Sequence, residues 1–253
     1  MWCESMKAIF LAAGIGSRLS KLSDRLPKSL VNINGKTLMQ RQILLLQQNE
    51  ISNIVIVRGF EKEKFHYKEV NFVNDDEFEE HEQLGSLIAA ESEIVNNILI
   101  IFGDIIFDSN ILNQILNSKN DISIAVDLDW KESYKERTDN PIELAGKILL
   151  DGQKIIQLSE KLPVEKKGFS IGEFLGIIKL TSNGSKILRD YLKKLKHHSG
   201  RFHDAESFKM AKLTDLLQHL IECNVEIKPV FIKGRWCEID TTIDLERAKR
   251  LFQ

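Results

Sequence analysis

The chain has 253 residues (29.0 kDa), of which 43% are hydrophobic and 28% are charged, a composition that excludes a disordered protein and allows a large core. The formal net charge of -2 provides no overall positive field and so disfavours nucleic acid as a partner. No apolar stretch approaches the roughly 18 residues of a membrane span, so we expect a cytoplasmic protein without a membrane partner. Cys3, Cys223 and Cys237 lack metal-site spacing, which favours reduced thiols.

The first half of the chain alternates predicted strands and helices. Residues 7–13 (KAIFLAA) form an apolar run that ends at Gly14, which predicts a buried strand followed by a glycine turn. The next elements expected are a helix at 37–49, strands at 54–57 and 70–73, a helix at 84–92, a strand at 98–102, a helix at 110–116 and a strand at 122–127. This alternation predicts a mostly parallel sheet with ligands at the carboxyl ends of its strands.

The second half begins with a different pattern. Residues 130–174 are more polar and carry a hairpin signal at Asp151 and Gly152, which predicts an antiparallel excursion over the site. Helices are expected at 186–196, 213–222 and 245–252, with a strand at 227–232. Without a repeat or a linker, residues 1–253 are expected to form a single domain in which 128–180 are an insertion on the acceptor side.

The loop after the first strand is a candidate anion site. Small residues let the backbone approach a ligand, and glycines adopt the φ values of a loop that wraps phosphates. Arg18 adds a fork of donors, and Lys28 brings a second cation at the end of the loop. The glycines alone also fit an ordinary turn between a strand and a helix, because neither nucleotide-binding glycine fingerprint is complete. The residues expected to present the backbone to the nucleotide are Leu11, Ala12, Ala13, Gly14 and Gly16.

Carboxylates at two distant positions form a candidate metal site. Asp104 directly follows a buried strand, and Glu238 and Asp240 lie near the end of the chain. Magnesium prefers hard oxygen ligands, usually one or two carboxylates together with water and phosphate oxygens. An aspartate at the end of a strand also serves as a helix cap, and Asp108 is a candidate for that role.

Gln83 and Ser86 lie at the start of the predicted helix at 84–92. The amide of Gln83 can offer both a donor and an acceptor to the edge of a nucleobase. The same residues also fit an ordinary helix start with an exposed serine.

The strand, the LAAGIGSRL segment and the PKSL segment that follows together resemble the signature of the sugar-phosphate nucleotidyltransferase superfamily. The resemblance implies a three-layer αβα, Rossmann-like (GT-A-like) fold with a mixed, mostly parallel sheet. It also implies that Arg18 and Lys28 are catalytic and that Gln83 and Ser86 bind the nucleotide. Asp104 and the late WCEID segment, with Glu238 and Asp240, would hold Mg²⁺.

A narrower resemblance rests on the VDLDW segment, on Tyr134 and Arg137, and on the GEFLG segment. These are similar to the cytidylyltransferases of phosphonate and phosphocholine metabolism, including enzymes of cell-surface polysaccharide biosynthesis. The implied substrates are CTP and 2-aminoethylphosphonate or phosphocholine. Asp129 and Glu173 would then meet an ammonium group, although these charges also fit a solvated hairpin. The candidates for holding the acceptor anion are Arg137, Lys147 and Lys161.

The expected reaction is attack of a phosphate or phosphonate oxygen on the α-phosphorus of CTP, with pyrophosphate as the leaving group. A phosphate monoester has a second pKa of about 6, so no general base is needed. Three alternatives stay open: a thymidylyl- or uridylyltransferase for a sugar 1-phosphate, a cytidylyltransferase for an amino-acid phosphate or phosphoramidate in capsule synthesis, and a nucleotide-sensing protein. The oligomeric state stays open as well, with a homodimer as one option.

Overall fold

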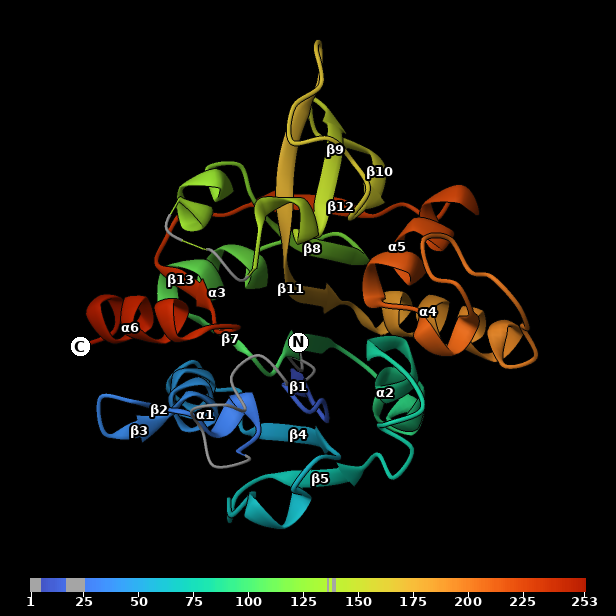
Figure 1. Ribbon diagram of the computed structural model, residues 1–253. Helices are drawn as coiled ribbons and strands as arrows, with labels where there is room; N and C mark the ends of the chain where they lie inside the picture. Colours follow the sequence, from blue (N-terminus) through green and yellow to red (C-terminus); the bar gives the residue numbers. More distant parts are fainter. Residues whose placement is uncertain (1–5, 17–25, 136, 138–139) are drawn as a thin grey trace.

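The computed structural model describes residues 6–16, 26–135, 137 and 140–253 (Figure 1). Within these residues, the main sheet has nine strands, and β1 (Lys7–Ala12) lies at its centre. β1 pairs in parallel with β4 (Asn53–Arg58) on one side and β6 (Ile98–Phe102) on the other. β5 (Asn71–Asn74) extends the parallel part beside β4. The uninterrupted apolar runs of these inner strands fit a sheet that is covered on both faces.

The other half of the sheet is mainly antiparallel and is organised by β11 (Ser170–Leu180), which pairs with three strands. These are β6, β8 (Ile122–Asp127) and β9 (Lys147–Asp151). β10 (Lys154–Ser159) forms a hairpin with β9, and β12 (Lys228–Phe231) runs parallel to β8. The predicted antiparallel excursion is therefore continuous with the main sheet.

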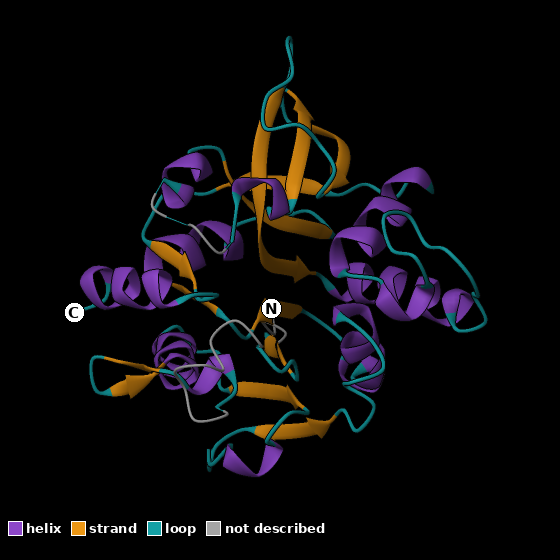
Figure 2. Ribbon diagram, viewed as in Figure 1, coloured by secondary structure: helices purple, strands orange, loops and turns teal. Residues whose placement is uncertain are grey.

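Helices cover both faces of the sheet, giving three layers (Figures 1 and 2). On one face, Ile9 and Leu11 belong to a core formed with α2 (Gln83–Ala89), α4 (Ser182–Leu195) and α5 (Leu213–Glu222). On the other face, Ala8 and Phe10 pack into a core with α1 (Leu38–Gln48) and α3 (Ser109–Leu116). This alternation follows from the two-residue period of a strand.

Two small sheets lie outside the main one. β2 (Asn32–Ile33) pairs with β3 (Lys36–Thr37), and β7 (Ile105–Phe107) pairs antiparallel with β13 (Trp236–Glu238). α6 (Thr242–Leu251) follows β13, and Ala248 in this helix and Phe252 directly after it pack with residues of both small sheets. The short 3-10 helices are η1 (Lys28–Leu30), η2 (Lys62–Lys64), η3 (Glu91–Glu93), η4 (Trp130–Tyr134), η5 (Ile142–Leu144) and η6 (Phe208–Met210).

The predicted αβα fold with its mixed, mostly parallel sheet is confirmed. Asp108 caps α3 by accepting a hydrogen bond from the Ile111 N–H, as predicted. α4 and α6 begin earlier than the apolar pattern indicates because Thr181 and Thr241 cap them. No helix in the described part of the chain is long and apolar enough to cross a membrane.

Candidate active site

A cavity of about 570 Å³ opens where β1 and β6 end, next to β11 and β13. Most of the predicted site residues line it. They are Leu11, Ala12, Ala13, Gly14, Gly16, Lys28, Gln83, Ser86, Asp104, Glu173, Glu238 and Asp240. Arg18 lies outside the described residues.

Two glycines permit close approaches beside the cavity. Gly16 has a φ of 63°, and a Cβ at this position would lie 2.5 Å from Cγ of Lys28. Gly103 donates its N–H to the Leu11 carbonyl, and a Cβ there would lie 2.7 Å from Cβ of Ala12. Gly16 therefore leaves room for the Lys28 side chain, and Gly103 lets the segment after β6 lie against the end of β1.

Asp104, Glu238 and Asp240 form a cluster in which one oxygen from each lies within 4.8 Å of the others. The register of β7 and β13, which places Glu238 opposite Ile105, produces this proximity. Lys28 Nζ donates to Asp104 Oδ2 at 3.2 Å and also to Asp240 Oδ1. Three carboxylates thus lie close together, and one ammonium group bridges two of them.

The electrostatics of this cluster favour a further cation. Burial raises the pKa of Glu238 well above its usual value, and the charges of Asp240 and Asp104 raise it further. Burial by itself would lower the pKa of Lys28, but the neighbouring carboxylates outweigh it and raise that pKa. The oxygen-only donor set suits a hard divalent cation such as Mg²⁺, and the Lys28 ammonium already bridges two of the carboxylates.

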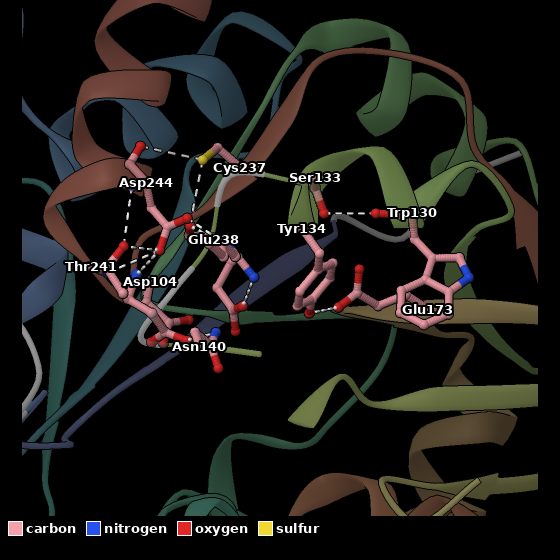
Figure 3. A network of polar contacts seen from close by, with 12 residues as sticks. Asp104, Trp130, Ser133, Tyr134, Asn140, Glu173, Cys237, Glu238, Thr241 and Asp244 are labelled. Carbon is pink, nitrogen blue, oxygen red and sulfur yellow. Dashed lines mark hydrogen bonds and ion pairs between the residues drawn. The ribbon is translucent and has the colours of Figure 1, made fainter. Parts of the chain in front are cut away.

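The cluster is supported from behind by the start of α6 (Figure 3). Asp244 Oδ2 accepts hydrogen bonds from the Thr241 N–H at 2.9 Å and the Asp240 N–H at 3.2 Å. Asn140 Nδ2 donates to Asp240 Oδ2 at 2.6 Å. Neither Asn140 nor Asp244 is a sequence-predicted site residue, because their partners depend on contacts between distant segments.

Glu173 lies on β11 at the acceptor side of the cavity and is only 5% exposed. The Tyr134 hydroxyl donates to Glu173 Oε1 (Figure 3). Among the described residues, none forms a hydrogen bond with Glu173 Oε2. Burial raises the pKa of Glu173 to about 7, although the Tyr134 hydrogen bond and the charge of Arg137 oppose this shift. Glu173 is thus a buried carboxyl group beside the cavity, and one of its two oxygens lacks a hydrogen bond within the described residues.

The other predicted acceptor residues do not line the cavity. Asp129 pairs with Lys233 at 2.5 Å on the surface, and Lys161 pairs with Asp204 at 3.3 Å. Lys147 is fully buried, and its Nζ donates to the carbonyls of residues 143 and 145 at 2.6 and 3.2 Å. The acceptor roles of Asp129, Lys147 and Lys161 stay predictions.

A hydrogen-bond network lies behind the predicted base-binding residues. Ser86 Oγ donates to Asp75 Oδ2 at 2.7 Å, and His81 Nε2 lies 3.0 Å from Asp75 Oδ1. Gln83 Oε1 accepts from the Leu213 N–H at 3.3 Å, so its amide NH₂ is the end left to read a base. Asp75 and His81 were missed from the sequence, although the position of Asp75 directly after β5 is the kind of strand-end signal that identified Asp104.

Comparison with solved structures gives the same fold. The CTP:phosphocholine cytidylyltransferase of Streptococcus pneumoniae superposes with a TM-score of 0.74 at 22% identity, covering 98% of this chain and 100% of that one. The inositol-1-phosphate CTP transferase of T. maritima also has a TM-score of 0.74, at 19% identity over 98% of this chain and 94% of its own.

Sequence comparison extends the relationship along the chain. The CTP:phosphoglutamine cytidylyltransferase of Campylobacter jejuni is 27% identical over 252 residues, covering 95% of this chain and 98% of that protein. The choline-phosphate cytidylyltransferase of Streptococcus pneumoniae is 28% identical over 214 residues, covering 77% and 91%. The model of the MobA-like NTP transferase domain matches residues 8–161, more than half of the chain. The resemblance predicted from the glycine loop is thereby confirmed, and the chain belongs to the MobA-like NTP transferase domain family.

Proposed function

We propose that this protein is a Mg²⁺-dependent cytidylyltransferase that transfers CMP from CTP to a small phosphorylated or phosphonylated acceptor and releases pyrophosphate. The observation that carries the proposal is the position of Lys28 between Asp104 and Asp240 at the end of the glycine loop. This arrangement combines a lysine, backbone N–H groups and an acidic cluster, which are the groups that transfer between polyanions requires. Family membership and the two cytidylyltransferase relatives support the choice of reaction and base.

In the proposed step, an acceptor oxygen attacks the α-phosphorus of CTP and the bond to the pyrophosphate oxygen breaks. The acceptor oxygen needs no general base near neutral pH, because the second pKa of a phosphate monoester is about 6. Lys28 Nζ would contact the α-phosphate or the attacking oxygen and stabilise the charge that develops there. When bound by Asp104, Glu238 and Asp240, Mg²⁺ would supply further positive charge to the phosphate oxygens.

Glu173 supports an acceptor whose head group carries a hydrogen-bond donor. Glu173 lines the cavity, its buried Oε2 has no hydrogen-bond partner among the described residues, and an ammonium or amide N–H that reached this oxygen would satisfy it. Both 2-aminoethylphosphonate and an amide phosphate meet this requirement, whereas a quaternary ammonium offers charge without an N–H. We further propose a single catalytic domain over residues 1–253 in which residues 128–180 form the acceptor side, working in the cytoplasm.

Pyrophosphate release tests the proposal directly. Each of four nucleoside triphosphates would be assayed with and without Mg²⁺ against 2-aminoethylphosphonate, phosphocholine, an amino-acid phosphate and several sugar 1-phosphates. Release with CTP and a non-sugar acceptor is the expected result. A preference for UTP or dTTP with a sugar phosphate would instead assign a sugar-nucleotide synthase, and no release with any pair would contradict an enzymatic role.

Lys28→Ala should lower turnover about 10²- to 10³-fold, as expected for the loss of one preorganised donor to the transition state. Lys36→Ala is the matched control, because Lys36 is an exposed lysine of the nearby β3 and does not line the cavity. If Lys28→Ala turned over as fast as the control variant, Lys28 would have no role in the reaction.

A further inference from the structure

Arg137 is buried beside the acidic cluster and directed away from the cavity. Its side chain is only 2% exposed, and its Cζ lies 4.5 Å from the centre of the Tyr134 ring. Nε donates to Asp244 Oδ1 at 2.7 Å, and Nη2 donates to the Glu238 carbonyl at 3.2 Å. Nη1 lies 3.5 Å from Glu238 Oε2. The guanidinium group therefore contacts Asp244 and Glu238, and Arg137 does not line the cavity where an acceptor would bind.

These contacts hold two of the three residues of the cluster, Glu238 directly and the backbone of Asp240 through Asp244. One edge of the guanidinium donates a hydrogen bond to the Glu238 carbonyl and forms an ion pair with its carboxylate. The other edge holds Asp244, whose second oxygen accepts the N–H groups of Asp240 and Thr241. A guanidinium group spreads its donors over three nitrogens in a rigid plane and can reach both residues at once, whereas the three donors of an ammonium group share a single nitrogen.

We propose that Arg137 is a positioning residue that sets the separation of Glu238 and Asp240 needed to bind a divalent cation. The inference rests on the proposed function in one respect, because it takes the acidic cluster to be the cation site. It gives Arg137 a role other than the acceptor contact predicted from the sequence. Outer contacts of this kind commonly change metal affinity by about 10- to 100-fold.

The informative variant is Arg137→Lys, which keeps the positive charge and removes the fork. The matched control is Arg247→Lys. Arg247 lies on α6, and its Nη1 donates to the Ser133 carbonyl at 2.9 Å, so it also joins α6 to η4. This hydrogen bond involves neither Glu238 nor Asp240, so a general loosening of α6 would affect both variants equally.

Mn²⁺ binding to each protein would be measured by calorimetry and by electron paramagnetic resonance, in parallel with the Mg²⁺ dependence of turnover. We expect Arg137→Lys to bind Mn²⁺ about 10- to 100-fold more weakly than the wild type and Arg247→Lys to bind it normally. Raised Mg²⁺ should restore the turnover of Arg137→Lys, and the KM for the acceptor should stay unchanged at saturating Mg²⁺.

Equal Mn²⁺ affinity in the wild type and Arg137→Lys would overturn the inference, and a raised acceptor KM with unchanged Mn²⁺ affinity would make Arg137 an acceptor residue. Failure of the proposed function is a separate result, because the wild type would then release no pyrophosphate with any substrate pair. Should Arg137→Lys fail to fold, Asp244→Asn, which removes the charged partner of the guanidinium, is expected to weaken Mn²⁺ binding in the same way.

Discussion

At the scale of single residues, Gly16 and Lys28 depend on one another. The Cβ of any other residue at position 16 would meet the Lys28 side chain, and the φ of 63° adds backbone strain. Gly35 has a φ of 88° and no atom within 4 Å of the corresponding Cβ. A substitution at either position would therefore strain the backbone, but only one at position 16 would also clash with a neighbouring side chain.

Gly16→Ala should consequently lower turnover strongly, while Gly35→Ala should leave it near the wild-type value. Both variants should lose about 1 kcal/mol of unfolding free energy, because both place alanine at a positive φ. Steady-state kinetics and urea unfolding of the two variants measure the difference. Equal turnover in both would mean that Gly16 does not determine the position of Lys28.

Glu173 makes the stability of the protein depend on pH. Its pKa is raised to about 7 in the folded protein and is about 4.3 in an unfolded chain, so the folded state holds the proton more tightly. The stability from this group is present below about pH 4 and is lost as the pH rises towards 7. The ionised carboxylate is the destabilising form.

Glu173→Gln should therefore gain stability relative to the wild type as the pH rises from 5 to 8, by up to roughly 3 kcal/mol. Thermal unfolding of both proteins across this range is the measurement. A constant difference in Tm would show that Glu173 does not titrate there. The same variant should raise the KM for an acceptor with an N–H donor and leave the KM for CTP unchanged.

At the scale of elements, the residues that cap the start of α6 also hold the acidic cluster in place. Thr241 and Asp244 form a capping box at its start, and the same Asp244 fixes the backbone of Asp240. Thr181 caps α4, which instead contributes to the core that α2 and α5 form on the main sheet. Both threonines accept a hydrogen bond from the backbone N–H three residues further on.

Thr241→Ala and Thr181→Ala should each cost about 1 kcal/mol, the usual loss for a threonine cap. Thr241→Ala alone should also require more Mg²⁺ for half-maximal turnover. Chemical denaturation and Mg²⁺ titration of both variants give the comparison. An unchanged Mg²⁺ requirement in Thr241→Ala would show that the helix cap does not influence cation binding by the acidic cluster.

The same scale explains what the sequence could and could not predict. β1, β4, β6 and β8 were predictable because fully buried strands leave uninterrupted apolar runs. The pairing of β7 with β13 was not predicted, since each has three residues and they lie about 130 positions apart. The residue types of the candidate site could be found at strand ends and in the glycine loop. The partners of Arg137, Asn140 and His81 depend on tertiary contacts and have no local pattern.

At the scale of the whole molecule, the cavity combines segments from the entire chain, so its ligands should stabilise the complete fold. A ligand at 100 times its Kd adds about 2.7 kcal/mol to the unfolding free energy. For a protein of this length, that corresponds to an increase in Tm of roughly 5 to 10 °C. CTP with Mg²⁺ should produce a larger shift than CTP or Mg²⁺ alone, as measured by scanning calorimetry. An equal shift with all four nucleoside triphosphates would contradict the proposed base preference.

The pairing of β7 with β13 also has a consequence for biosynthesis on the ribosome. All nine strands of the main sheet precede residue 232, whereas Glu238 and Asp240 follow it. A nascent chain could therefore complete its sheet while still lacking two of the three carboxylates of the cluster. Cation binding by the cluster would become possible only after Glu238 and Asp240 had left the exit tunnel, and a stop codon after Lys233 would leave all nine strands of the main sheet encoded with Asp104 as the one carboxylate of the cluster.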